Sequence, residues 1–289
     1  MGHVAHAFAK LKSNLEITET EQSQASSRRQ AMYGLITEHW DVTNVFLTGS
    51  YDRHTKTKKL KDVDIFVVID DDGEQGDYRS RYPSAVLQSL KKVLETKYHN
   101  VTVDGVACVI SFGADEEIMS FEVVPAFERS GGGYEIPDPS TGGWLSTDPT
   151  KHAEATTAKN GACDQRWVPF VKMVKAMNRE ADSPIEPSFL IEVMALDLVR
   201  PPFGRYQDEI AYFCASAADQ VVNDWPDPAN LGPIVNREMS AFDRELAARQ
   251  FRAWQTVAEN AIDLEDEGRE RAAVDKWREL FGYRMPKAS

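Results

Sequence analysis

Two short segments decide the fold: Thr48-Gly49-Ser50-Tyr51 and, twelve residues after Ser50, Asp62-Val63-Asp64. An apolar run at residues 44–47 leads into the Gly-Ser pair, and a second run at residues 65–69 follows the two aspartates. Both runs have the length and composition of buried β-strands. The first segment is therefore predicted to end one strand and the second to begin another.

The residue types in these segments suit a phosphate and metal site. Side chains two apart on a strand share a face, so Asp62 and Asp64 are expected to point the same way. Two adjacent carboxylates repel each other, and divalent cations between them and a phosphate remove that conflict. Gly49 lets the backbone approach a ligand closely, and Ser50 offers an N–H and a hydroxyl to phosphate oxygens. The sequence thus predicts a phosphate-binding turn followed by a metal site.

Either motif alone is more often an ordinary surface turn or strand end with no chemical role, because short motifs are weak signals. Together, with Arg53, Thr55 and Lys56 between them, they resemble the pattern of the polymerase-β-like nucleotidyltransferases. The main competitor is a phosphatase of the haloacid dehalogenase type, which also uses an Asp-x-Asp motif. In that class the aspartates end a hydrophobic strand, whereas here they begin one, which argues against it.

Length and composition limit the possible classes of protein. The chain has 289 residues, of which 42% are apolar, enough for one large domain or two small ones with a real core. No apolar run approaches the length of a membrane span, and the first residues resemble neither a signal peptide nor a myristoylation site. Three scattered cysteines suggest neither a metal cluster nor a disulfide framework, so a cytoplasmic location is expected.

The formal net charge of −13 would repel a nucleic acid. Only residues 53–61 are clearly basic, and they lie inside the predicted phosphate motif. This local charge fits nucleoside triphosphates better than duplex DNA or RNA, although a basic face built from distant residues stays an alternative.

The first half of the chain alternates between helical and strand patterns. Residues 4–40 predict two helical pieces, with a capping box at residues 18–21 and a long helix that braces the sheet. A second amphipathic helix is predicted over residues 86–98. Strands are expected at residues 101–112 and 118–127, which a polar turn at residues 113–117 joins as a hairpin, and the Gly- and Pro-rich residues 131–143 predict a loop.

The second half is almost wholly helical. The pattern places the domain boundary near Lys159, which gives a sheet-containing domain at 1–159 and a helical domain at 160–289. The fold class is therefore α+β, with a mixed sheet, bracing helices and a C-terminal α-helical domain. Helices are predicted at residues 167–178, 188–199, 205–222 and, as two long segments, 236–281.

Glu122, Lys175 and Ser188 are three further candidate residues. Glu122 stands alone in an apolar strand, so it needs a partner: either a protein cation or a metal shared with Asp62 and Asp64. Lys175 shares a helix face with Lys172, and surface lysines usually only solvate a helix. Ser188 precedes a predicted helix and is a candidate N-cap.

Several separated blocks resemble one family, the bacterial CD-NTases, which are relatives of cyclic GMP-AMP synthase and oligoadenylate synthase in anti-phage (CBASS) signalling. These blocks follow in order from residue 4 to the end of the helical domain. They are Gly49-Ser50-Tyr51-Asp52-Arg53-His54-Thr55, Asp62-Val63-Asp64, Glu122-Val123-Val124-Pro125-Ala126-Phe127, residues 144–152 with Asn160, Lys175-Ala176-Met177-Asn178, and Ser188-Phe189 with Glu192.

The resemblance implies a polymerase-β-like nucleotidyltransferase core and a helical half that closes over a nucleotide pocket. It implies that two Mg²⁺ ions, or Mn²⁺ in their place, bind Asp62, Asp64 and Glu122, and that all three residues are catalytic. It also implies nucleotide binding by four residues: Gly49, Ser50, Lys175 and Ser188. Metal-assisted attack of a nucleoside 3′ or 2′ hydroxyl on the donor α-phosphorus, repeated in one pocket, would release diphosphate and close a ring.

The resemblance also implies partners. They are nucleoside triphosphates with ATP among them, an effector protein that senses the product, and regulatory proteins. The zinc-binding insertion of the animal DNA sensor is not visible in the sequence, which argues against activation by nucleic acid. Two departures from the family pattern are Glu122, where Asp is usual, and His54, where Gly is common.

Two other function classes stay open at this level. A linear nucleotidyltransferase that modifies RNA or protein would share the core. A non-catalytic nucleotide-binding module would have lost acidic ligands, whereas all three positions are acidic here.

Overall fold

The computed structural model describes residues 2–58, 60, 62–112 and 120–288. The chain divides into two compact units, Ile17–Ala153 and the combination of Met1–Glu16 with Glu154–Ser289. We call the first the sheet unit and the second the helical unit. None of the helices in the described ranges is long and apolar enough to cross a membrane.

This division differs from the expected domains 1–159 and 160–289 at both ends. Helix α1 (His3–Leu15) packs on α6 (Trp167–Glu180) and α10 (Glu270–Phe281) of the helical unit, because its apolar face joins their core. The second break lies at residues 153 and 154, within α5 (Pro149–Ala162), and not at Lys159.

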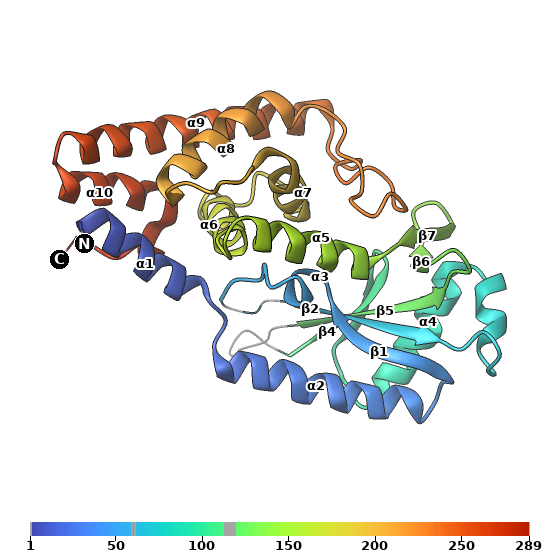
Figure 1. The fold of residues 1–289 in the computed structure, drawn as a ribbon. Coiled ribbons are helices and arrows are strands. Elements are labelled where there is room, and N and C mark those ends of the chain that lie inside the picture. Colours follow the sequence, from blue (N-terminus) through green and yellow to red (C-terminus); the bar gives the residue numbers. More distant parts are fainter. Residues whose placement is uncertain (1, 59, 61, 113–119, 289) are drawn as a thin grey trace. The chain divides into compact units, whose positions relative to one another are not determined.

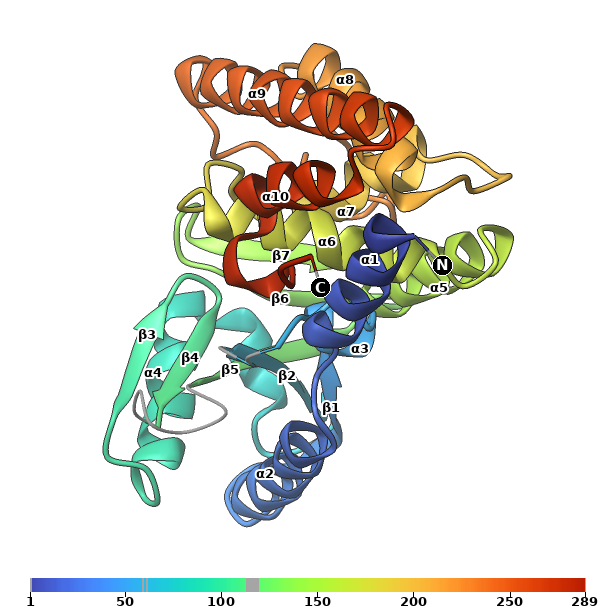
Figure 2. The same cartoon turned by 90° about the vertical axis from the view of Figure 1, so that its left-hand side faces the viewer.

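A mixed sheet forms the centre of the sheet unit. Its strand order is β1-β2-β5-β4-β3, with β6 and β7 continuing from β5 (Figure 2). The β2–β5 pair is parallel and the other pairs are antiparallel. The strands are β1 (Val42–Thr48), β2 (Asp62–Ile69), β3 (Val101–Asp104), β4 (Ala107–Ser111), β5 (Ser120–Glu128), β6 (Tyr134–Asp138) and β7 (Gly143–Thr147).

Two helices, α2 (Glu19–Thr37) and α4 (Pro83–Glu95), cover one face of this sheet (Figure 1). Their apolar sides pack on the odd-numbered residues of the central strands, among them Val63, Ile65, Phe121 and Val123. The even-numbered residues of β2 and β5 therefore lie on the opposite face. Two short helical segments complete the unit, α3 (Gly49–Asp52) and η1 (Gly76–Ser80).

The predicted capping box is confirmed. Thr18 is the N-cap of α2; its hydroxyl accepts from the Glu21 N–H, and the Glu21 carboxylate accepts from the Thr18 N–H. This reciprocal bonding satisfies backbone groups that a helix start leaves open. It also explains why the helical pattern breaks between α1 and α2.

Two strand predictions were wrong. Residues 101–112 form a hairpin of two strands, because Gly105 turns the chain with φ +52°. The predicted loop at residues 131–143 contains β6, which pairs with β5 and β7. The predicted pairing of β4 with β5 is confirmed, while the expected turn at residues 113–117 lies outside the described residues.

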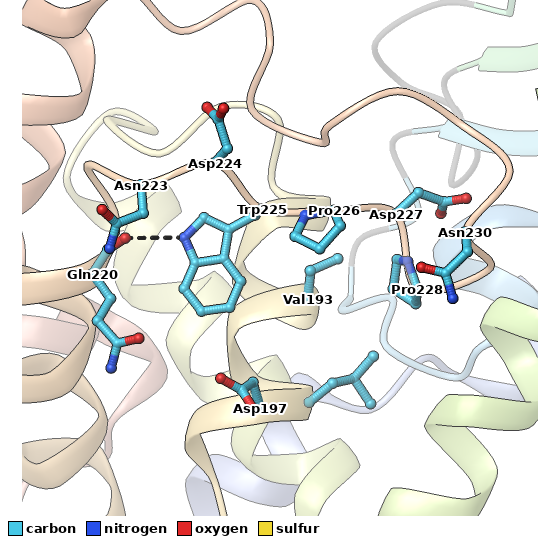
Figure 3. A pocket seen from close by; sticks show the side chains of 11 residues that line it. Val193, Asp197, Gln220, Asn223, Asp224, Trp225, Pro226, Asp227, Pro228 and Asn230 are labelled. Carbon is cyan, nitrogen blue, oxygen red and sulfur yellow. Dashed lines mark hydrogen bonds between the residues drawn. The ribbon is translucent and has the colours of Figure 1, made fainter.

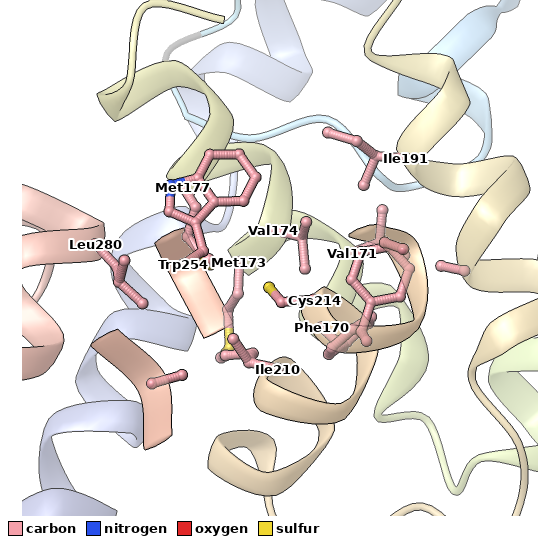
Figure 4. Close-up of a cluster of buried hydrophobic side chains, with 14 of the residues drawn as sticks. Phe170, Val171, Met173, Val174, Met177, Ile191, Ile210, Cys214, Trp254 and Leu280 are labelled. Atoms are coloured by element: carbon pink, nitrogen blue, oxygen red, sulfur yellow. The ribbon is translucent and has the colours of Figure 1, made fainter. Parts of the chain in front are cut away.

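The helical unit packs around α6 (Trp167–Glu180), in which residues 169–178 are all buried. Side chains of α6 meet α8, α9 and α10 in one apolar core (Figure 4). The predicted helices are confirmed, whereas α5 was not predicted. The remaining elements are α7 (Phe189–Leu198), α8 (Tyr206–Gln220), α9 (Ala241–Asp266), α10 (Glu270–Phe281) and η2 (Gly282–Arg284).

Candidate active site

Three carboxylates share one face of the sheet. In the parallel β2–β5 pair, Asp64 lies opposite Glu122 and Asp62 lies opposite Ser120. Because side chains alternate along a strand, the three acids lie on the face opposite α2 and α4. The sheet thus brings together the three acidic residues that the sequence predicted as catalytic.

The environment of Glu122 is unfavourable for negative charge. Burial raises its pKa from 4.5 to about 7, and the neighbouring negative charges of Asp64 and Asp62 add to the rise, while Lys56 opposes it. A group that would neutralise these acids is therefore favoured here. The same balance leaves Glu122 able to hold or release a proton near neutral pH.

Asp64 lies against the Gly49 backbone. A Cβ atom at Gly49 would fall only 1.7 Å from Asp64 Oδ2, and Gly49 has φ +65°. Both facts require glycine at this position, because no L side chain fits the space and few adopt the conformation. The glycine of the Gly-Ser turn and the second aspartate are therefore in direct steric contact.

The Gly-Ser turn also folds the basic loop back onto itself. The Ser50 carbonyl accepts from the Thr55 N–H at 3.0 Å and from the Lys56 N–H at 2.9 Å. His54, which lies between Ser50 and Thr55 in the chain, has φ 58°, a conformation that glycine adopts more easily. The turn thus forms with histidine in a conformation that suits glycine better.

Lys56 was missed as a site residue, although the sequence analysis had noted its charge. Its ammonium lies 2.5 Å from Asp62 Oδ2, and the lysine side chain is buried while that of Asp62 is 40% exposed. A lysine and a carboxylate separated by a short loop gave the only sequence signal for this pair. The pair places a cation directly beside the acidic face.

The donor set fits hard divalent cations, which prefer carboxylate oxygens. As placed, however, no group of three or more His, Cys, Asp or Glu side chains in the described ranges has the geometry to hold a metal ion. One oxygen of the set, Asp62 Oδ2, is already paired with the Lys56 ammonium. The residues present are thus of the right type and on the right face, and metal binding requires their side chains to converge.

The two predicted binding residues of the helical unit have different environments. Lys175 is buried and its ammonium lies 2.5 Å from Glu192 Oε1, with Glu192 only 1% exposed. Lys172 is also buried and pairs with Glu16 at 2.5 Å. The alternative that these lysines merely solvate a helix face is therefore wrong. Ser188 is the exposed N-cap residue of α7, and its side chain makes no capping hydrogen bond.

The helical unit also contains a cavity of about 550 Å³ that the sequence did not reveal. Side chains of α7 and of the segment that follows α8 surround it (Figure 3). The loop at Trp225 is held in place by Asn236, whose Oδ1 accepts from the Trp225 N–H and whose Nδ2 donates to the Asn223 carbonyl. Among the described residues, the lining of this cavity combines apolar side chains with carboxylates and amides and includes no cationic residue. A phosphate group is therefore a poor fit to this cavity.

Comparison with protein families gives a match over residues 1–160 to the family described as Second Messenger Oligonucleotide or Dinucleotide Synthetase domain, SMODS. The match spans more than half of the chain. This protein belongs to the SMODS family. The sheet face with its three acids, and the glycine turn against Asp64, lie within the matched residues.

Relatives of this SMODS protein include nucleotide synthases. A cyclic AMP-AMP-AMP synthase from an Acinetobacter species is 24% identical over 309 residues, which cover 98% of this chain and 85% of the relative. The structure of Escherichia coli MS115-1 CdnC with ATP matches with a TM-score of 0.74 at 17% identity over 99% of both chains. CdnC in complex with HORMA-deltaN matches with a TM-score of 0.73 at 17% identity, over 99% of this chain and 98% of that one. These structural likenesses establish the nucleotidyltransferase fold.

Proposed function

We propose that this SMODS protein joins nucleoside triphosphates, ATP among them, into a cyclic oligonucleotide second messenger and releases diphosphate. The observation that carries the proposal is the strand register that sets Asp64 opposite Glu122, with Asp62 on the same face. The family match and the likeness to nucleotide synthases support it. In the family's biological context, the product would signal phage infection to an effector protein.

The acidic face would carry the chemistry. Asp62, Asp64 and Glu122 would bind Mg²⁺ or Mn²⁺; two such ions, when bound, lower the pKa of an attacking hydroxyl and neutralise charge on the departing diphosphate. Glu122 would also help take the proton of that hydroxyl. Asp64 would be held in register by its contact with the Gly49 backbone.

Other residues would bind the triphosphate. Gly49 and Ser50 would present backbone N–H groups and a hydroxyl to its oxygens. Lys56 would contribute a positive charge at the same turn, since it already lies beside Asp62. In the helical unit, we propose Lys175 and Ser188 as further triphosphate contacts, and the buried position of Lys175 supports a role beyond surface charge.

Regulation by a partner protein is part of the proposal. The match to CdnC in complex with HORMA-deltaN supports a protein regulator for this chain as well. An effector that senses the product would act downstream of the synthase.

Product identification tests this function. The purified protein is incubated with Mg²⁺ and each radiolabelled nucleoside triphosphate, singly and mixed, and the products are treated with phosphatase. We expect a small phosphatase-resistant nucleotide whose mass identifies a ring. A labelled RNA or protein, with no such nucleotide, would instead identify a linear transferase.

A further inference from the structure

We propose that Glu21 is a positioning residue for nucleotidyl transfer, which holds the loop between the Gly-Ser turn and the aspartates. The inference rests on the proposed function of the acidic face. It concerns a side chain on α2, on the other face of the sheet from the three acids, which the sequence analysis used only as a helix cap.

The Glu21 carboxylate makes two kinds of contact. One oxygen, Oε2, accepts from the Thr18 N–H at 2.7 Å and the Thr18 hydroxyl at 2.9 Å, which completes the capping box. The other oxygen, Oε1, accepts from the Leu60 N–H at 3.0 Å, across 39 positions of sequence. Glu21 is only 2% exposed. A capping box needs only the first of these contacts, so the second requires another explanation.

Leu60 lies at a sensitive place in the chain. Its side chain is fully buried in the core between the sheet and α2, and it stands two residues before Asp62. Its N–H is fixed by Glu21, while at the other end of the loop the Ser50 carbonyl fixes the N–H groups of Thr55 and Lys56. Among the described residues of this connection, the backbone is therefore held at Thr55 and Lys56 and again at Leu60.

The buried character of the loop makes this anchoring important. Thr55, Lys56 and Thr57 are all less than 10% exposed, which is unusual for a polar connection. Buried polar backbone needs hydrogen-bond partners, and a charged acceptor such as Glu21 forms the stronger kind. Loss of the Leu60 contact would let the start of β2 shift, and Asp62 with it.

The chain contains a matched control. Ser240 and Asp243 form a second capping box at the start of α9, where Asp243 Oδ2 accepts from the Ser240 N–H at 3.0 Å and from its hydroxyl at 2.6 Å. Among the described residues, Asp243 makes no side-chain hydrogen bond to a distant loop. An aspartate can therefore complete a capping box, but it is one methylene too short to do so and also reach Leu60.

The discriminating variant is accordingly Glu21→Asp, compared with Asp243→Ala. We expect Glu21→Asp to keep the helix cap and most of the thermal stability. It should weaken Mn²⁺ binding measured by calorimetry roughly tenfold, the size seen when a residue that orients a metal ligand is lost, and lower kcat more than it raises KM. Asp243→Ala should lower the unfolding temperature and leave Mn²⁺ affinity and kcat as in the wild type.

Hydrogen exchange gives a second readout, which depends on neither metal binding nor turnover. In the wild-type protein the Leu60 amide should exchange slowly by mass spectrometry, and in Glu21→Asp it should exchange faster while the α2 amides stay protected. Wild-type Mn²⁺ affinity and kcat in Glu21→Asp, or a rapidly exchanging Leu60 amide in the wild type, would overturn the inference. Absence of any nucleotide product from the wild type would refute the proposed function instead, and the metal-affinity and exchange results would still decide the role of Glu21.

Discussion

Asp64 and Glu122 face each other across the only parallel strand pair among the described strands, and the Asp64 carboxylate is pressed against the backbone of Gly49. This relationship links the two sequence motifs physically. The glycine turn cannot change without moving one acid, and that acid influences the protonation of the other. The predictions below test this coupling and its consequences.

Gly49→Ala should abolish nucleotide product. The new Cβ would overlap Asp64 Oδ2 and force either the turn or the carboxylate to move. The positive φ adds a cost of about 1–2 kcal/mol to folding. Product formation and the unfolding temperature are measured together.

Gly105→Ala is the matched control for this prediction. Gly105 also has a positive φ, +52°, but a Cβ there meets nothing within 4 Å. It should cost comparable stability and leave product formation unchanged. If both variants lose activity equally, backbone strain and not the contact with Asp64 explains the effect.

Lys175→Ala should affect both stability and nucleotide binding. Removing a buried partner of Glu192 costs about 3 kcal/mol, as measured by denaturant unfolding. If Lys175 also binds the triphosphate, ATP affinity should fall by about 1.5–3 kcal/mol, measured by calorimetry at a temperature where the variant is folded.

Lys172→Ala serves for comparison, because its partner Glu16 has a side chain that is 44% exposed. We expect a smaller loss of stability and no change in ATP affinity. Unchanged ATP affinity in Lys175→Ala would restrict Lys175 to a structural ion pair.

The pH dependence of stability should reflect Glu122. Its pKa is raised in the folded protein, so the folded state binds the proton more tightly than the unfolded state does. The contribution of Glu122 is therefore most favourable below pH 4.5, is lost as pH rises through about 7, and is constant above that. In metal-free protein, Glu122→Gln should flatten this part of the profile of unfolding temperature against pH.

Mg²⁺ should act in the opposite sense at the same residue. Because a metal requires the ionised carboxylate, the rise in unfolding temperature on adding Mg²⁺ should be larger at pH 8 than at pH 6. Glu122→Gln should reduce this difference. An equal rise at both pH values in the wild type would argue that Glu122 does not contact the metal.

Much of the fold follows from local sequence patterns. The strands on either side of the two motifs, the capping box at Thr18 and the helices of the second half were predicted because apolar periodicity and capping are local properties. The hairpin at Gly105 was missed because a single glycine interrupts an otherwise continuous apolar run. Helix α5 was missed because its apolar residues show little periodicity.

The candidate active site was harder to predict from the sequence than the fold was. The two aspartates could be placed on one face from their spacing alone. That Asp64 lies opposite Glu122 depends on the parallel pairing of β2 with β5, strands that are far apart in the chain. The Lys175–Glu192 pair and the contact of Glu21 with Leu60 likewise arise only when separate elements pack. The Lys56–Asp62 pair is local, but it depends on how the short loop between the two residues folds.

The most direct test of the central claim is the rate of diphosphate release from nucleoside triphosphates with Mg²⁺. It is measured for the wild type, for the double variant Asp62→Asn with Asp64→Asn, and for Glu122→Gln, with circular dichroism to confirm the fold of each. The account predicts nucleotide-dependent diphosphate release by the wild type, none above background by the double variant, and nearly none by Glu122→Gln even though it still binds ATP. Release at the wild-type rate by the folded double variant would contradict it.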